Sequence, residues 1–272
     1  MAQYQEISHI FSAAGGTTDP KSSDAGSYLL FTEGSRLVSK FWNGQALSGN
    51  DTITEGVRPD SVVVYLIKVS TIFCISDQSK LRALYYDEDE DSWLDKDIPS
   101  ISAHPESQLT AFSIPGKGTY VFLQDPSNNL IYIDVNWESH IIKGTVPITG
   151  SPLSAQPSEN GPQVFYISSL DGQVHYATQA ADNTWSDEIM AKVPIDNPKR
   201  LQASLNEKEA LEAYVLTKDD ELALITSGEE GKLDVLGKVD SDGNLTPSTS
   251  AQCGGYYRRR CCCCRRWHCC CW

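Results

Sequence analysis

Five side chains in the middle of this sequence could bind a small molecule and polarise it. They are Tyr120, Tyr132, Gln163, His175 and Tyr176. Tyrosine, histidine and glutamine can each donate a hydrogen bond to a carbonyl oxygen, and an aromatic ring can pack on the C–H surface of a ligand. All five lie in strand-like segments. The arrangement of those strands therefore decides which of these side chains can act together.

The sequence lacks the motifs of enzymes that use a bound cofactor or an activated nucleophile. It contains no G-x-G-x-x-G, G-x-x-x-x-G-K-[ST], G-x-S-x-G or H-E-x-x-H pattern. The acidic run Asp87–Asp91 lacks the glycine and the spaced ligands of a calcium loop, and we expect a solvated turn there. His9 could join Tyr65 and Thr110 at the centre of a ring of strands, although such a histidine is more often structural. We expect no cofactor and no metal.

The strands recur with a period of about 47 residues. Five hairpins repeat, and their first strands begin 43, 49, 43 and 49 residues apart. The hairpins are Tyr28–Thr32 with Leu37–Trp42, Thr71–Ile75 with Leu81–Tyr86, Tyr120–Gln124 with Leu130–Val135, Gln163–Ile167 with Val174–Thr178, and Glu212–Leu216 with Leu222–Thr226. Turn residues such as Glu33-Gly34-Ser35 and Leu170-Asp171-Gly172 separate the two strands of a hairpin.

Each repeat is predicted to have four strands. An inner strand precedes each hairpin, and the five inner strands are predicted at Ile7–Ala13, Ser61–Ile67, Gln108–Ile114, Pro152–Pro157 and Leu201–Leu205. A short fourth strand follows the hairpin, near Trp93, Trp137 or Trp185 in three repeats. Four-stranded units of this length, arranged radially, form a β-propeller. The predicted fold class is therefore all-β, a propeller of four-stranded blades.

A sixth repeat begins and then breaks off. Ser154-Ala155-Gln156 recurs as Ser250-Ala251-Gln252, two periods later, and a Cys/Arg-rich stretch follows. We expect one propeller domain over residues 1–252, of the six-bladed type with an altered last blade, and a low-complexity tail over residues 253–272. Runs of adjacent cysteines fit an altered reading frame better than the spaced pairs of a zinc site. A metal-binding or lipid-modified tail is the alternative.

Charge and hydropathy exclude several classes of partner. The net charge is −14, and residues 1–252 carry 17 basic against 36 acidic side chains. Such an acidic body disfavours nucleic acid and anionic membranes. No run of 18 apolar residues and no signal peptide is visible, which favours a cytoplasmic over a secreted protein. The sequence does not indicate an oligomeric state.

The repeats resemble those of the fungal fucose-specific lectins, which are six-bladed propellers. The resemblance is clearest in Thr71–Ser76 with Lys80–Asp87, and in Gln163–Ile167 with Gln173–Ala177, each followed by a tryptophan. It implies sugar sites between adjacent blades, each with an arginine that opens the second strand, a glutamate early in the third, and covering aromatic rings.

No repeat keeps the arginine and glutamate. The arginine positions hold Tyr28, Thr71, Tyr120, Gln163 and Glu212, and the glutamate positions hold Ser39, Ala83, Tyr132, Tyr176 and Leu224. Below, these are called the first and second slots. A polar site without its charged groups should lose most of its affinity. Tyr120, Tyr132, Gln163, His175 and Tyr176 are candidate ligand contacts because they occupy or adjoin these slots.

Two functions follow from this combination of scaffold and lost sugar ligands. The first is a cofactor-free cyclase or hetero-Diels–Alderase-like enzyme of fungal natural-product biosynthesis, because some enzymes of that kind resemble the lectin scaffold. Such an enzyme would act by orienting a small organic molecule. The alternative is a divergent lectin that binds a fucosylated or another glycan.

Overall fold

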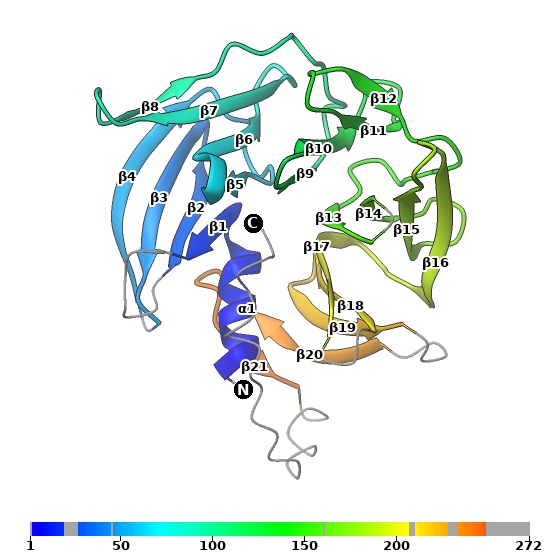
Figure 1. The fold of residues 1–272 in the computed structure, drawn as a ribbon. Coiled ribbons are helices and arrows are strands. Elements are labelled where there is room, and N and C mark those ends of the chain that lie inside the picture. Colours follow the sequence, from blue (N-terminus) through cyan, green and yellow to red (C-terminus); the bar gives the residue numbers. More distant parts are fainter. Residues whose placement is uncertain are drawn as a thin grey trace. The chain divides into compact units, whose positions relative to one another are not determined.

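The computed structural model describes residues 2–18, 27–44, 46–159, 161–206, 210–227 and 233–248. The described chain divides into two compact units, one within residues 13–141 and one that combines residues 2–12 with residues 142–248. Sequential antiparallel sheets, here called blades, make up both units; four have four strands and the last has five (Figure 1). We name the units after their blades, blade 1–3 unit and blade 4–5 unit. The tail expected at residues 253–272 lies outside the described residues.

The blade 1–3 unit contains three sheets and one short 3-10 helix, η1 (Ile67–Val69). Blade 1 consists of β1 (Gly15–Thr18), β2 (Ser27–Glu33), β3 (Arg36–Trp42) and β4 (Leu47–Glu55). Blade 2 consists of β5 (Val64–Leu66), β6 (Thr71–Ile75), β7 (Leu81–Asp87) and β8 (Ser92–Asp95). Blade 3 consists of β9 (Leu109–Ile114), β10 (Gly118–Gln124), β11 (Leu130–Ile133) and β12 (Ser139–Ile141).

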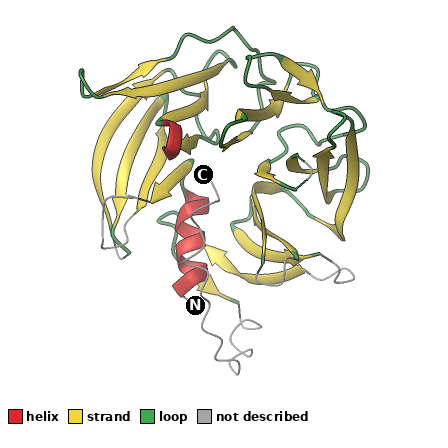
Figure 2. Ribbon diagram, in the orientation of Figure 1, coloured by secondary structure: helices red, strands yellow, loops and turns green. Residues whose placement is uncertain are grey.

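The blade 4–5 unit contains two sheets and the helix α1 (Ala2–Ser12). Blade 4 consists of β13 (Ser154–Pro157), β14 (Pro162–Ile167), β15 (Gln173–Gln179) and β16 (Trp185–Pro194). Blade 5 consists of β17 (Pro198–Leu205), β18 (Leu211–Thr217), β19 (Glu221–Thr226), β20 (Leu233–Val239) and a fifth strand, β21 (Leu245–Pro247). Figure 2 shows that strands dominate the described chain. No helix in the described part of the chain is long and apolar enough to cross a membrane.

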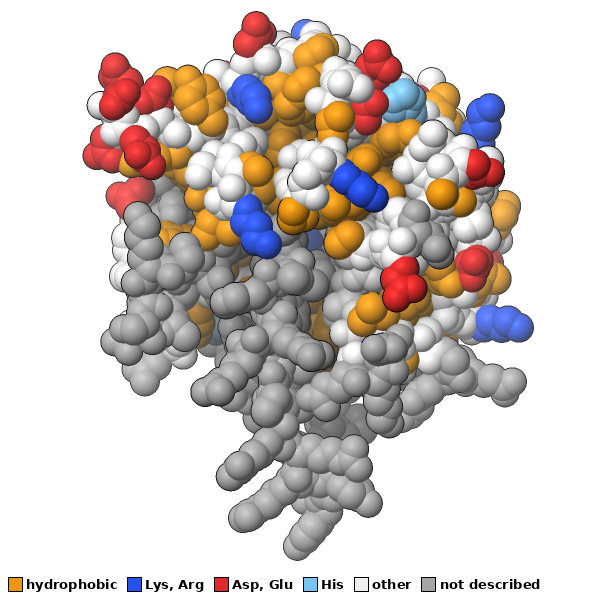
Figure 3. Space-filling view, in the orientation of Figure 1, with side chains coloured by type: hydrophobic (Ala, Val, Ile, Leu, Met, Phe, Trp, Pro, Cys, Tyr) orange, Lys and Arg blue, Asp and Glu red, His pale blue; other side chains and the backbone are white. Residues whose placement is uncertain are grey.

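All five predicted hairpins are present. The second and third strands of each blade pair in antiparallel register, from β2 with β3 to β18 with β19. The acidic run Asp87–Asp91 forms the exposed turn between β7 and β8, as expected. Acidic side chains occur in several separate places on the face drawn in Figure 3 and do not form one patch there. Their scattering is typical of solvated turns.

A connector with a buried serine repeats before blades 2, 3 and 4. The serines are Ser61, Ser107 and Ser151, all inaccessible to solvent. The residue three positions before each serine donates its backbone N–H to a backbone carbonyl, at 2.8–2.9 Å. That carbonyl belongs to the last residue of the second strand of the next blade. In two connectors the serine Oγ also accepts a backbone N–H of that strand, from Gln124 or Ile167. These bonds satisfy buried backbone groups at the blade entrance, so the serine has a structural role.

The expectation of a strand at Ile7–Ala13 is wrong. Residues Ala2–Ser12 form α1, and the inner strand of blade 1 is β1, which begins at Gly15. Tyr4, Ile7 and Phe11 follow a three- and four-residue spacing that places them on one helical face. Ser8 and His9 interrupt the apolar pattern, yet both are buried. The helix was therefore hidden by polar residues on its buried face.

Helix α1 covers the face of blade 5 that points away from blade 4. Ile7 and Phe11 pack in one cluster with Tyr214, Leu216, Leu222, Leu236 and Val239, and Tyr4 and Leu224 lie against it. The Ser8 hydroxyl donates to the carbonyl of Gly243 at 2.6 Å, and the side-chain oxygen of Gln5 accepts the N–H of Leu245 at 3.1 Å. Gly243 has a φ of +81°, and a Cβ there would lie 2.6 Å from Ser12 Oγ. The helix thus occupies the side of blade 5 where a further blade would pack.

Replacing Phe11 with alanine should destabilise the protein by about 3–5 kcal/mol, because the substitution leaves a cavity between α1 and blade 5. Urea denaturation followed by fluorescence measures the loss. The matched control is Leu205→Ala on β17, where the side chain is 57% exposed and its removal should cost little. A loss for Phe11→Ala no larger than that of the control would show that α1 does not cover blade 5.

Candidate functional site

The two slots occupy the same register in every blade. The residue two positions after the first slot is paired directly with the second slot, in the pairs Leu30–Ser39, Phe73–Ala83, Phe122–Tyr132, Phe165–Tyr176 and Tyr214–Leu224. Residues at these positions point to the same face of their sheet. The sequence alignment of the repeats is therefore confirmed, and the slots can be compared blade by blade.

The slots of blade 2 are filled by packing. Thr71 and Ala83 are both buried, and the ring of Trp137 lies 6.2 Å from the ring of Phe73. The ammonium group of Lys96 lies over Trp137, 5.6 Å from its centroid. Trp137 belongs to blade 3, so the aromatic cover between blades 2 and 3 remains although the polar groups beneath it are gone.

The slots of blade 5 are covered by α1. Leu224 lies against the cluster that Ile7 and Phe11 form with blade 5. Glu212, in the first slot, accepts a hydrogen bond from Asn206 Nδ2 at 2.7 Å. A ligand could reach these positions only if the helix moved.

The slots of blade 4 hold two of the predicted ligand residues, Gln163 and Tyr176. Gln163 donates to Thr178 Oγ1 and accepts from Gln156 Nε2, both at 3.0 Å. The Tyr176 hydroxyl donates to Glu188 at 2.6 Å, and burial together with this acceptor raises its pKa to about 12. Both side chains face blade 5, because Phe165 on the same face packs in the cluster with blade 5. Each has a partner within the chain.

His175 lies on the opposite face of blade 4 from Tyr176. Its ring is buried between two carboxylates, with Nδ1 at 2.9 Å from Asp187 and Nε2 at 3.1 Å from Asp171. The Tyr166 hydroxyl donates to the same Asp187 at 2.7 Å, and burial and this contact raise the pKa of Tyr166. A ring with protons on both nitrogens satisfies both carboxylates, whereas a neutral ring satisfies one. His175 and Tyr176 therefore cannot bind one ligand together.

Tyr120 and Tyr132 share one face of blade 3 and belong to a continuous row of rings. Tyr120 stacks on Phe112 with centroids 5.8 Å apart, and Tyr132 stacks on His140 at 4.9 Å. Phe122 lies between Phe112 and Tyr132 and joins the two pairs. The structure thus brings these two predicted ligand residues onto one aromatic surface.

Among the five first slots, that of blade 1 is the most exposed. Tyr28 is 40% exposed and its ring lies 5.2 Å from that of Phe41. The register of blade 1 places Ser39 and Asp51 on the same face as Tyr28. Leu30 on this face packs with Ile72 and Leu84 of blade 2.

Blade 2 presents an aromatic group to this face. The ring of Trp93 makes edge contacts at 5.4 Å with both Tyr65 and Tyr86. Tyr65 and Trp93 pack against the cluster that joins the two blades. Tyr28, Phe41, Tyr65, Tyr86 and Trp93 are called the aromatic junction below. The sequence predicted Trp93 as a strand marker, and Tyr28 and Tyr65 were considered but not chosen as site residues.

Arg82 fixes the two sheets beside the aromatic junction. Its guanidinium binds both oxygens of Asp95, at 2.9 and 2.8 Å, and donates to the Glu55 carbonyl and the Thr54 hydroxyl of blade 1. The hydrogen bonds to Asp95 raise the pKa of Arg82. Bidentate pairs of this kind hold their geometry well.

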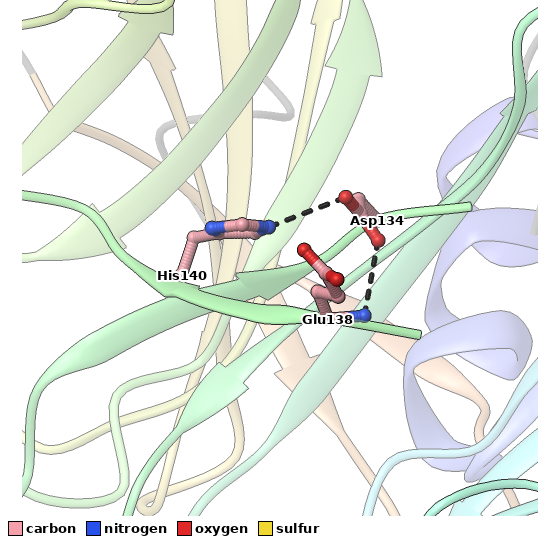
Figure 4. Close-up of side chains that lie close together, drawn as sticks. All are labelled: Asp134, Glu138 and His140. Atoms are coloured by element: carbon pink, nitrogen blue, oxygen red, sulfur yellow. Dashed lines mark hydrogen bonds and ion pairs between the residues drawn. The ribbon is translucent and has the colours of Figure 1, made fainter. Parts of the chain in front are cut away.

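A cluster of possible metal ligands, which the sequence did not predict, lies beside Tyr132. One ligand atom from each of Asp134, Glu138 and His140 falls within 4.8 Å of the others (Figure 4). Burial raises the pKa of Asp134, but the N–H groups of Glu138 and Asn136 and the His140 ring outweigh it, so the pKa lies below its ordinary value. The three residues belong to one hairpin, and the spacing Asp-x-x-x-Glu-x-His would have been the sequence signal for them.

His9 has a structural environment. It is buried in α1, where burial lowers its pKa despite the nearby Asp242 backbone and the Asp240 carboxylate. Its Nε2 lies 3.1 Å from Gln5 Nε2. These contacts agree with the structural interpretation of this histidine.

Known structures with a similar fold include fungal lectins. The lectin of Aleuria aurantia, in complex with α-methyl-L-fucoside, matches 82% of this chain and 77% of its own, with a TM-score of 0.63 and 11% identity. Another structure of that lectin, described as a six-bladed β-propeller, matches 85% of this chain and 80% of its own at a TM-score of 0.59 and 11% identity. The lectin SapL1, in complex with α-methyl fucoside, matches 86% of this chain and 81% of its own, with a TM-score of 0.56 and 14% identity.

These similarities show the fold. The chain is an all-β propeller of four-stranded blades, and five blades lie in its described part. No protein-family model matches the sequence, and no curated protein is detectably similar to it. The prediction of a single domain over residues 1–252 stays a prediction.

Replacing Asp171 with asparagine should reduce stability at pH 7 and reduce the sensitivity of the protein to acid. Burial raises the pKa of Asp171, but the N–H of Gln173 and the His175 ring outweigh it, and the pKa is lowered. The ionised carboxylate therefore stabilises the fold above its unfolded pKa of about 4, and this contribution is lost as the pH falls through the lower folded value.

Denaturation midpoints measured from pH 7 to pH 3 test this expectation. The stability difference between the wild type and Asp171→Asn should shrink as the pH falls. Asp97→Asn, at an exposed position, is the control and should not change the pH profile. A difference that is constant over this range would contradict a role for the charge of Asp171.

Proposed function

We propose that this protein is a glycan-binding β-propeller whose sugar contacts differ from the arginine–glutamate pair of the fucose-specific lectins. Two observations carry the proposal. The exposed ring of Tyr28 lies on the face of blade 1 whose Leu30 packs with blade 2, and Tyr65 and Trp93 of blade 2 pack against the same cluster. The similar lectins bind α-methyl fucosides. The same scaffold supports a carbohydrate ligand for this chain.

The aromatic junction has the chemistry that a sugar requires. A sugar ring offers an apolar C–H face to aromatic side chains and a set of hydroxyl groups to polar ones. The exposed ring of Tyr28 supplies the first kind of contact, and the Ser39 hydroxyl and the Asp51 carboxylate supply the second. Asp51 is exposed and can accept from two neighbouring hydroxyl groups, as the lost glutamate would.

The other slots are less suited to a ligand. Those of blades 2 and 5 are filled by side chains from Trp137 or from α1. In blade 4, Gln163 and Tyr176 would have to exchange hydrogen bonds within the chain for those to a ligand. Tyr120 and Tyr132, on the aromatic surface of blade 3, are a second proposed contact region, and His175 is proposed only as a support for blade 4.

The comparisons favour the glycan function over the cyclase function that the sequence also suggested. Two of the similar proteins are lectins whose structures contain α-methyl fucosides. The residues at the slots argue against fucose itself. No first slot holds an arginine and no second slot holds a glutamate, which are the residues expected for fucose binding. We therefore expect a glycan other than a terminal α-fucoside.

Replacing Tyr28 with alanine should weaken glycan binding at least about tenfold, because the ring contributes the apolar contact surface. The protein is first screened on an array of fucosylated and non-fucosylated glycans, and the affinity for the best glycan is then measured by calorimetry. The matched control is Tyr85→Ala, since Tyr85 is 37% exposed on the opposite face of blade 2.

An array without signal above heat-denatured protein would refute glycan binding. Equal loss in Tyr28→Ala and Tyr85→Ala would place the binding surface elsewhere. A strong signal for α-methyl fucoside would contradict the expectation that the lost arginine and glutamate excluded this sugar.

A further inference from the structure

Three turns of this protein share one hydrogen-bonded frame. They are Asp125–Asn129, Asp134–Glu138 and Asp240–Asn244, and each begins with an aspartate. In all three, the aspartate Oδ1 accepts the backbone N–H groups of the residues two and four positions later, at 2.8–3.0 Å. These two hydrogen bonds therefore need the aspartate side chain. They do not need the side chain of the residue four positions later.

The residue four positions after the aspartate distinguishes one turn from the other two. In two turns it is an asparagine, Asn129 or Asn244, whose Nδ2 donates to the Oδ2 of the aspartate at 2.9 or 3.1 Å. In the third turn it is Glu138, which as a carboxylate has no proton to donate. Asp134 Oδ2 instead lies 3.2 Å from His140 Nε2.

Glu138 adds a negative charge where the sister turns supply a hydrogen-bond donor. In the described part of the chain, no lysine or arginine pairs with its carboxylate. Two neighbouring carboxylates repel each other unless a cation or a proton lies between them. A blade 4 turn with the same backbone bonds, Ala180–Thr184, has alanine and threonine at the two equivalent positions. There a different carboxylate, that of Asp182, accepts the Thr184 N–H, so the backbone bonds do not require an acidic residue at either equivalent position.

The histidine completes a set of three ligands on one hairpin. Figure 4 shows the side chains of Asp134, Glu138 and His140 gathered at the same end of β11 and β12. One ligand atom of each lies within 4.8 Å of the others. The His140 ring stacks on Tyr132 with a centroid distance of 4.9 Å and an angle of 25° between planes. Stacking and the turn thus hold two of the three ligands before any ion arrives.

We propose that Asp134, Glu138 and His140 bind one divalent transition-metal ion. An imidazole combined with two carboxylates suits Zn²⁺, Co²⁺ or Ni²⁺, whereas Ca²⁺ and Mg²⁺ prefer sites built from oxygen alone. Three ligands from the protein leave a coordination position for water or for an oxygen atom of a ligand. This position lies beside the aromatic surface of blade 3 that contains Tyr132.

Zinc titration of the full-length protein tests the site. The thiols are first alkylated, because eight of the nine cysteines follow residue 252 and would bind the ion themselves. Calorimetry with Zn²⁺ should give one site per chain, and Co²⁺ should produce a visible absorption band whose intensity reports the coordination number. Two controls, His104→Gln and His268→Gln, should leave the affinity unchanged.

The decisive variant is Glu138→Asn, which installs the residue of the two sister turns. It should fold normally, because the amide can donate to Asp134 as Asn129 does to Asp125. Its zinc affinity should fall at least about tenfold, as should that of His140→Gln. Zinc should raise the melting temperature of the wild type but not that of Glu138→Asn.

Two results would overturn the proposal. One is a wild type that binds no zinc at millimolar concentration. The other is an affinity that Glu138→Asn and His140→Gln leave unchanged, since zinc would then bind at another place.

Discussion

Both faces of every blade must be covered, and this requirement governs the rest of the structure. The blades have apolar residues on both faces, as Leu29 and Leu30 or Val164 and Phe165 show by their complete burial. Within each unit, consecutive blades cover one another. Blade 5 has a further apolar face around Tyr214 and Leu236, and α1 covers it. An amphipathic helix can therefore replace a sheet as the partner of a blade, because the face requires apolar area and not a particular element.

The same packing determines where a ligand can bind. The slots of this chain are filled to different extents in different blades. Ala83 and Thr71 are buried beneath neighbouring side chains, and Leu224 lies under α1. Tyr28, in contrast, remains 40% exposed. The exposure of the slots is thus unequal among blades of one architecture, and the fold alone does not determine it.

Local patterns made the hairpins predictable, whereas contacts between distant segments remained hidden. Alternating apolar residues and turns such as Leu170-Asp171-Gly172 act within ten residues, so sequence alone indicated them. The burial of Ser8 and His9 depends on Gly243, more than 230 residues away, and no local pattern indicates it. The slots were aligned correctly because strand register repeats. Whether each slot is open depended on Trp137 and α1, which approach from outside the hairpin.

Repeated sequences provide internal comparisons that a single-copy fold lacks. Copies at equivalent positions experience the same backbone, so a difference between them reflects the side chain and its surroundings. Asn129 and Asn244 show what a turn of this kind needs for stability, and Glu138 departs from it by exchanging a donor for a charge. That exchange replaces the asparagine donor with a second carboxylate, and His140 becomes the partner of Asp134 Oδ2. A residue that is unfavourable for its own turn is best explained by an external partner, and for two carboxylates beside an imidazole that partner is a cation.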